Sequence, residues 1–193
     1  MNDGYIDPRA CIGMPPEHRE HRFAMKHPLR SSDIDDPVML RRLAAANGWR
    51  TPIIAKSAIV EAFASIDCGL ERFTWIGERV YVMKHAHVGH DAYIGAGVNL
   101  APGCVIGGHV TIGVGTKVGI GAVIRPRVTV GCDVVIGAGA VVVDNVPDGE
   151  TWVGNPARPL RNHKGPTMAP DHWAGSEEEY QLWLDAFGPG YKP

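Results

Sequence analysis

Residues 94–118 read IGAGVNLAPGCVIGGHVTIGVGTKV and place an aliphatic side chain at every sixth position. The same period runs unbroken from Ile76 to Val142. Four residues after each aliphatic position comes a small or β-branched residue, so both positions are expected to face inward. Neither a helix, with a period of about 3.6, nor a simple hairpin strand, with a period of about 2, explains this pattern. Each hexapeptide is therefore predicted to be a short strand followed by a turn.

Glycine often follows the aliphatic residue directly, and we expect it at corners where the backbone needs unusual dihedral angles. These glycines are Gly77, Gly89, Gly95, Gly107, Gly113, Gly119, Gly131 and Gly137. Three hexapeptides, hence 18 residues, make one triangular coil, and coils stack at about the 4.8 Å spacing of hydrogen-bonded strands. The sequence predicts an all-β solenoid, a parallel β-helix around a continuous aliphatic core.

The repeat also divides the chain into regions. Hexapeptides starting at Ile6 and Ile12 indicate an additional coil near the amino terminus, and four extra residues around 72–75 shift the phase and indicate a small loop. The predicted regions are 1–17, a first partial coil; 18–53, an inserted loop and helix; 54–161, the hexapeptide β-helix; and 162–193, a tail with a short helix.

Both predicted helices have recognisable ends. In the insertion, Asp36 caps a helix that Pro37 opens and Gly48 ends. In the tail, Ser176 and Glu179 form a capping box before an amphipathic segment. We expect the first helix to plug the open end of the coil stack, and the second to pack on the solenoid or on a neighbouring subunit.

Composition narrows the kind of partner. The 19 basic and 21 acidic side chains are intermixed and give a formal charge of −2, which argues against binding to nucleic acid or to an anionic membrane. The four cysteines form no CxxC pair, the first residues lack the features of a secretion signal, and no run approaches the roughly 20 apolar residues of a membrane span. We expect free thiols and a soluble, cytoplasmic protein that acts on a small molecule.

The most specific motifs are MKHAHVGHDAYIG, residues 83–95, and IGGHVTIG, residues 106–113. With them, residues 54–161 resemble the hexapeptide-repeat acyltransferases, a left-handed β-helix family that includes UDP-N-acetylglucosamine O-acyltransferases and sugar O- and N-acetyltransferases. The resemblance implies a left-handed coil and an acyltransferase, most simply an acetyltransferase. It also places His90 and Asp91 on a His-Asp or His-Glu pair of that family.

This resemblance implies a role for each catalytic residue. His90 is the general base on an acceptor hydroxyl or amine, a task for which a neutral imidazole is suited. Asp91 orients the ring or stabilises the imidazolium, and the backbone N–H of Gly108 stabilises the oxyanion. Because Gly108 follows His90 by 18 residues, one full coil, we expect it directly above His90.

Further residues are predicted to bind the two substrates. The residues expected to contact the acceptor are Lys84, His85, His87 and His109. A solvated surface position, or for His87 and His109 a contact between subunits, remains an alternative. VGNPARPL, residues 153–160, looks like the end of coenzyme A-dependent acetyltransferases, so acetyl-CoA or another acyl-CoA is the expected donor. Cations expected to bind its phosphates are Lys117, Arg125, Arg127, Arg158 and Arg161.

The resemblance further implies a homotrimer with its sites between subunits, a small acceptor such as a sugar or nucleotide sugar, and no metal. Acyl chain length and O- versus N-acylation stay open. Three alternatives remain: an acyl-carrier-protein-dependent acyltransferase, a non-catalytic β-helix scaffold, and a zinc enzyme like γ-class carbonic anhydrase. His85 and His90 have the spacing of that zinc enzyme, although no histidine between residues 28 and 84 supplies its upstream ligand.

Overall fold

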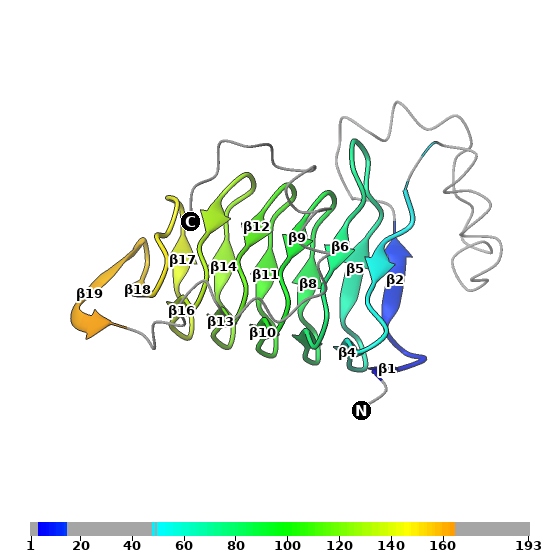
Figure 1. Ribbon diagram of the computed structural model, residues 1–193, viewed down its shortest axis with the longest axis horizontal. Coiled ribbons are helices and arrows are strands. Elements are labelled where there is room, and N and C mark those ends of the chain that lie inside the picture. The colour runs from blue at the N-terminus through cyan, green and yellow to red at the C-terminus, as the bar shows by residue number, and fades with distance from the viewer. Residues whose placement is uncertain (1–3, 15–47, 49, 165–193) are drawn as a thin grey trace.

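The computed structural model describes residues 4–14, 48 and 50–164. This part of the chain consists of short strands joined by turns, and Figure 1 shows them as a row of stacked coils. The two predicted helices lie outside the described residues. Within the described residues, no helix combines the length and the hydropathy that crossing a membrane requires.

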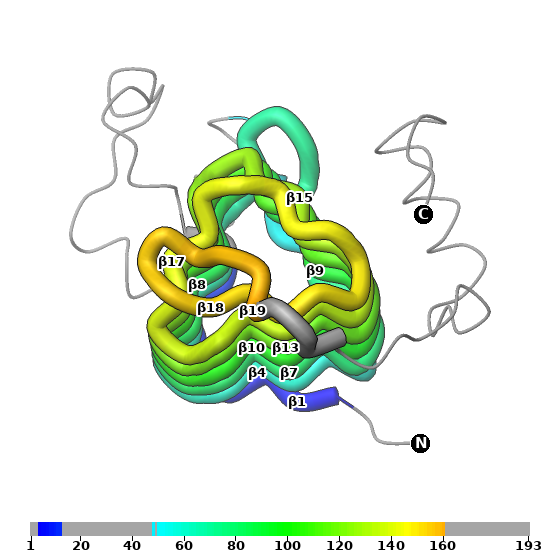
Figure 2. The backbone as a smooth tube through the Cα atoms, turned by 90° about the vertical axis from the view of Figure 1, so that its left-hand side faces the viewer, coloured from blue at the N-terminus to red at the C-terminus, as the bar shows by residue number. Residues whose placement is uncertain are grey.

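Strands of successive coils pair to form three sheets, one on each side of a triangular cross-section (Figure 2). Sheet 1 contains β1 (Tyr5–Ile6), β4 (Ile59–Val60), β7 (Tyr81–Val82), β10 (Asn99–Leu100), β13 (Lys117–Val118), β16 (Val135–Ile136), β18 (Glu150–Gly154) and β19 (Ala157–Lys164). Sheet 2 contains β2 (Cys11–Met14), β5 (Ser65–Asp67), β8 (His87–Val88), β11 (Val105–Ile106), β14 (Val123–Ile124) and β17 (Val141–Val142). Sheet 3 contains β3 (Ile53–Ile54), β6 (Trp75–Ile76), β9 (Tyr93–Ile94), β12 (Thr111–Ile112) and β15 (Thr129–Val130).

The coil is left-handed. Seen from its carboxy-terminal end, the chain passes clockwise from sheet 1 to sheet 2 to sheet 3 while it approaches the viewer (Figure 2). Strands one coil apart pair in parallel, as β8 does with β11. For the described residues, the predicted left-handed parallel β-helix of hexapeptide repeats is confirmed.

The predicted inward positions form the core. From Ile76 to Val142, the aliphatic residue at every sixth position is at most 2% exposed. The small or β-branched residues four positions later are also buried, including the hydroxyl-bearing Thr116. Removing one such aliphatic side chain from water contributes about 1.5–3 kcal/mol, so the column along the axis drives folding.

From β3 to β17, the register between coils is regular except at one point. His87 pairs with Val105 one coil, 18 residues, further on. Ser65 and His87, however, are 22 residues apart and still pair. The four extra residues lie in the 68–74 loop between β5 and β6, which projects between sheets 2 and 3 at the top of Figure 2. This is the small loop predicted around 72–75.

The prediction of unusual dihedral angles at the glycines after the aliphatic residues was wrong. None of them has a positive φ; they are needed because adjacent coils approach closely. An added Cβ on Gly89, for example, would lie 2.8 Å from the backbone nitrogen of Gly108. The left-handed position comes third after the aliphatic residue. Residues other than glycine with a positive φ are Phe63, Arg79, His85, Asp91, His109, Arg127 and Asp133.

Both ends of the described solenoid extend beyond the uninterrupted repeat. Strands β1 and β2 pair with β4 and β5, so residues 5–14 add to the stack. At the other end, β18 pairs in parallel with β16 and antiparallel with β19. The repeat did not predict this hairpin, whose second strand runs past residue 161. The proposed boundaries of the four regions remain predictions.

The four cysteines are free thiols, as expected. Cys11 is exposed, whereas Cys68 and Cys104 are buried. Burial raises the pKa of each of these two thiols to about 12. A buried thiol that stays protonated is a poor nucleophile. Cys68 and Cys104 therefore act as small core residues.

The close approach of the coils leads to a stability prediction. An added Cβ in Gly95→Ala would lie 2.9 Å from the carbonyl oxygen of Ile112, and backbone atoms cannot move aside cheaply. We expect the free energy of unfolding in urea to fall by roughly 1–3 kcal/mol. Gly139→Asn is the control, since its surroundings are open and asparagine tolerates a positive φ. Equal effects of the two substitutions would contradict the explanation.

Candidate active site

His90 and Asp91 lie in the turn between β8 and β9 and form a buried pair. The Nδ1 atom of His90 lies 2.7 Å from Oδ2 of Asp91. Asp91 is fully buried and His90 is 8% exposed. The φ of Asp91 is +58°, in the left-handed region, which aspartate adopts more readily than most residues. This backbone conformation lets the carboxylate reach back to the ring of the preceding residue.

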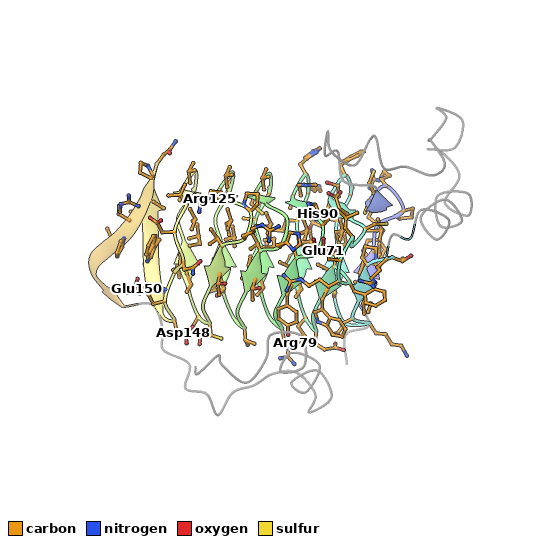
Figure 3. All side chains as sticks on the ribbon, turned by 90° about the horizontal axis from the view of Figure 1, so that it is seen from above. Glu71, Arg79, His90, Arg125, Asp148 and Glu150 are labelled. Carbon is orange, nitrogen blue, oxygen red and sulfur yellow. The ribbon has the colours of Figure 1, made fainter. Side chains whose placement is uncertain are left out.

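The 68–74 loop holds the carboxylate of Asp91. The backbone N–H groups of Leu70, Glu71 and Arg72 all donate to Oδ1 of Asp91, over 3.0, 2.9 and 2.7 Å respectively. Arg72 also donates through Nε to the carbonyl oxygen of Asp91 at 2.7 Å, and Thr74 accepts from the Asp91 N–H at 3.0 Å. Figure 3 places Glu71 close to His90. The irregular loop thus fixes the orientation of a side chain on the next coil.

These contacts keep Asp91 ionised. Burial alone would raise its pKa, but the hydrogen bonds from His90 and from the three backbone N–H groups of the loop lower it to about 2. An ionised carboxylate only accepts hydrogen bonds, so the proton between the two side chains belongs to Nδ1 of His90. When the ring is neutral, the other ring nitrogen, Nε2, carries a lone pair that can accept a proton. This is the tautomer that a general base requires.

Gly108 lies against the Nε2 side of His90. A Cβ added to Gly108 would lie 2.5 Å from Nε2 of His90, so only glycine leaves space for the ring at this place. The adjacent His109 N–H donates to the carbonyl oxygen of His90. Within the described part of the chain, the N–H of Gly108 donates no hydrogen bond. The site therefore has a free backbone donor on the coil next to His90.

His109 completes the cluster. Its ring meets that of His90 edge to face, with centroids 5.1 Å apart, and its Nε2 lies 3.6 Å from Oδ2 of Asp91. Burial lowers the pKa of His109, and the attraction of Asp91 does not compensate. A neutral His109 is therefore favoured, and it borders the space beside the His90 ring.

The other predicted acceptor-binding residues lie earlier in the same coil. His87 projects from β8, with Nδ1 2.8 Å from Oγ of Ser65 and Nε2 3.8 Å from Oδ2 of Asp67. Lys84 and His85 lie in the preceding turn, at the corner between sheets 1 and 2. His85 and His90 therefore occupy different corners of one coil, and a single chain does not bring them together as metal ligands.

Two of the five predicted phosphate-binding cations share the corner of His90. Arg125 and Arg127 lie in the turn between β14 and β15, and Arg127 N–H donates to the carbonyl oxygen of Gly108. Figure 3 places Arg125 further toward the carboxy-terminal coils than His90. Lys117 projects from sheet 1, and Arg158 pairs with Asp144 near the last hairpin. Arg161 lies in β19, where its side chain is not described.

The sequence reasoning missed Leu70, Glu71, Arg72 and Thr74 as residues of the site. Their contacts to Asp91 come mainly from backbone N–H groups, which any residue except proline supplies. The available signal was the four-residue phase shift in an otherwise unbroken period, because an irregularity next to a regular scaffold often has a function.

Comparison with known proteins shows what this chain is similar to. A family model described as bacterial transferase hexapeptide, with six repeats, matches residues 73–108. The search of curated proteins returns no match.

Several solved structures of sugar acyltransferases are similar. The chain is 29% identical to perosamine N-acetyltransferase from Caulobacter crescentus, solved with CoA and GDP-perosamine, with a TM-score of 0.50 over 63% of this chain and 62% of that one. It is 39% identical to the acetyltransferase domain of PglB from Neisseria gonorrhoeae, with a TM-score of 0.54 over 56% and 51%. UDP-N-acetylglucosamine O-acyltransferase from Moraxella catarrhalis shares the fold, with a TM-score of 0.66 over 96% and 63% at 18% identity.

The protein is a left-handed β-helix of hexapeptide repeats, and the proteins it resembles are acyltransferases. The resemblance to hexapeptide-repeat acyltransferases that residues 83–95 and 106–113 predicted is thereby confirmed. The chain spans less than two thirds of the length of each of these three proteins.

The hydrogen bonds to Asp91 predict a pH dependence of stability. Because its pKa falls from an ordinary 3.8 to about 2 in the folded state, the ionised carboxylate stabilises the fold fully above about pH 5. This contribution, about 2 kcal/mol, is lost as the pH falls toward 2. We expect the free energies of unfolding of the wild type and Asp91→Asn, measured in urea, to converge between about pH 5 and pH 2. Parallel curves would show that the carboxylate is not held as described.

Proposed function

We propose that this protein is an acyltransferase that moves an acyl group, most simply acetyl, from acyl-CoA to a hydroxyl or amine of a small acceptor. The observation that carries the proposal is the buried His90–Asp91 pair, whose tautomer is set by the 68–74 loop and whose Nε2 lies against Gly108. Asp91 orients His90, and His90 is the general base.

The proposed reaction needs a proton acceptor and an oxyanion donor. His90 Nε2 removes the proton of the acceptor hydroxyl or amine while the acceptor oxygen or nitrogen attacks the thioester carbonyl carbon. The resulting oxyanion takes a hydrogen bond from the N–H of Gly108, which no other described group uses. The intermediate then expels the CoA thiolate, which receives the proton from His90. Asp91 remains ionised throughout and stabilises the transient imidazolium.

Support for the two substrates comes from the relatives. Perosamine N-acetyltransferase was solved with CoA and a GDP-linked sugar, so CoA as donor and a sugar or nucleotide sugar as acceptor are the simplest proposal for this chain. Arg125 and Arg127 lie on the coil after Gly108 and are exposed, as phosphate-binding cations must be. His87 and His109 flank His90 and are proposed to position the acceptor; Lys84 and His85 would contact its more distant part. Lys117, Arg158 and Arg161 remain proposed contacts to CoA.

We further propose a cytoplasmic homotrimer with its sites between neighbouring solenoids. The resemblance to the acyltransferases supports this assembly. A narrow β-helix offers flat faces and shallow grooves, so a second subunit is a natural way to enclose a substrate.

The proposal is tested by measuring thiol release from acetyl-CoA with a panel of amino sugars, nucleotide sugars and small alcohols. His90→Ala is expected to lower kcat/KM by roughly 10²- to 10⁴-fold, the usual contribution of a general base. Asp91→Asn is expected to lower it as well, because an amide no longer imposes the Nδ1-protonated tautomer.

Asp133→Asn is the matched control for Asp91→Asn. Asp133 is also a left-handed corner aspartate, with a φ of +53°, but it lies in a later turn, away from His90. The Asp133→Asn variant should retain wild-type turnover. If no acceptor accelerates CoA release in the wild type and CoA does not bind, the proposed function is wrong. If acyl transfer requires an acyl carrier protein instead of CoA, the proposed acyltransferase chemistry stays the same and only the donor changes.

A zinc-dependent reaction is the second candidate, because ligand atoms of His90, Asp91 and His109 lie within 4.8 Å of one another. The geometry favours the acyltransferase. Oδ1 of Asp91 already accepts three backbone N–H bonds and Oδ2 accepts from His90, so a cation would have to displace strong hydrogen bonds. Metal analysis of the purified protein, with turnover measured after chelation, separates the two: stoichiometric zinc and loss of activity would favour the metal enzyme.

A further inference from the structure

A column of three stacked planar side chains lies at the corner between sheets 1 and 2, away from the His90 corner. The Arg9 guanidinium lies 5.5 Å from the centroid of the Phe63 ring. The Phe63 ring stacks in turn on His85, with centroids 5.4 Å apart and an angle of 8° between the planes. Each of the three comes from a successive coil. We call this set, Arg9, Phe63 and His85, the corner column.

At the amino-terminal end of the corner column, Arg9 forms a salt bridge with Asp7. Arg9 donates through Nε and Nη2 to the two carboxylate oxygens of Asp7, both at 3.0 Å. Its carbonyl oxygen accepts the N–H of Phe63 at 3.2 Å. A two-point contact to a carboxylate fixes the plane of a guanidinium. The Phe63 ring therefore rests on a surface that is already oriented.

Neither backbone preference nor burial explains why aromatic rings occupy this corner. Phe63 and His85 have φ values of +61° and +60°, and a bulky residue in this region is uncommon and strained. In the next three coils the equivalent residue is glycine, at Gly103, Gly121 and Gly139. Phe63 is nevertheless 53% exposed and His85 is exposed too, so the rings bury little surface. Backbone strain at two exposed aromatic residues that add little to the core points to a role in binding a ligand.

The column stops at an open position. The next residue in line is Gly103, and a Cβ built there meets no atom within 4 Å. Gly103 and its neighbour Pro102 are both exposed. One face of the His85 ring is covered by Phe63, and the other faces the coil that carries Gly103. A flat ring placed over Gly103 would continue the stack.

We propose that the corner column binds the base of a nucleotide, so that the acceptor of the reaction is a nucleoside diphosphate-linked molecule. The inference rests on the proposed function and names its substrate class. His85 and His90 belong to the same coil and are five positions apart, at most roughly 17 Å of extended chain. A diphosphate and a sugar bridge a gap of this length, across sheet 2 and past His87. Lys84, exposed beside His85, supplies a positive charge for the diphosphate.

The acceptor is favoured over CoA as the source of the base. CoA also carries a purine, but the exposed cations on the His90 corner, Arg125 and Arg127, lie on a later coil than the corner column. A donor held by these arginines approaches His90 from the carboxy-terminal side. An acceptor whose base is bound at His85 reaches His90 from the other corner of the coil.

The test is ligand-observed NMR with uridine 5′-diphosphate and guanosine 5′-diphosphate, without any donor. Saturation is expected to be strongest on the base protons, and ribose 5-phosphate, which lacks a base, should bind much more weakly. His85→Gly is expected to weaken nucleotide binding by roughly tenfold to a hundredfold, the usual effect of removing one stacking surface. His85→Phe, which retains a flat ring, should restore most of the affinity.

These variants separate binding from folding. His85→Gly introduces the residue that later coils use at this position, so its stability should equal or exceed that of the wild type. Gly103→Asn fills the open position and should weaken binding. Gly139→Asn makes the same change two coils further on, where a Cβ also meets nothing within 4 Å, and should leave binding unchanged.

Several outcomes would overturn the proposal. The proposal is wrong if neither nucleotide binds, or if each binds with the same affinity to the wild type, His85→Gly and Gly103→Asn. It is also wrong if adenosine 3′,5′-bisphosphate, the nucleotide part of CoA, binds more tightly than either nucleotide and loses affinity in His85→Gly. That result would assign the corner column to CoA. Finally, it is wrong if His85→Gly changes the mass of the assembly in solution, because the corner column would then be a contact between subunits. Because no donor is present, these results do not depend on whether CoA turnover is found.

Discussion

Every feature of the site depends on the register between successive coils. Parallel strands one coil apart are joined by backbone hydrogen bonds, and the aliphatic column allows no slip of one residue without exposing the core. A residue is therefore placed against the residue 18 positions later wherever the period is regular. His90 meets Gly108 for this reason. Arg9, Phe63 and His85 stack at another corner because their coils stay paired even where extra residues interrupt the period.

From β3 to β17, the 68–74 loop is the one place where the regular coils take up extra chain, and the chemistry depends on it. A carboxylate buried on a β-helix corner would be destabilised by the loss of water. Three backbone N–H groups and one imidazole replace that water around Asp91. The same contacts hold the His90 ring in one orientation and one tautomer. The irregular loop thus makes a histidine at a corner of the coil a candidate base.

Sequence reasoning predicted the features that the hexapeptide period dictates. The inward positions, the parallel solenoid and the stacking of His90 against Gly108 all result from a repeat of six. Three features were not predicted. The contacts to Asp91 come mainly from backbone atoms, which carry no residue-specific signal. The glycines at positions such as Gly89 serve close approach, whereas the left-handed residues, Asp91 among them, come two positions later. The β18–β19 hairpin lies after the period ends, where long-range pairing decides the structure.

The ionised Asp91 keeps the proton of the neutral His90 ring on Nδ1 and leaves Nε2 unprotonated. The ring nitrogen chemical shifts of ¹⁵N-labelled His90 measure this directly, with His90→Ala used for assignment. In the neutral ring of the wild type, we expect a protonated Nδ1 and an unprotonated Nε2, and in Asp91→Asn a change of this pattern. A wild-type spectrum with the proton on Nε2, or with the two tautomers equally populated, would contradict it.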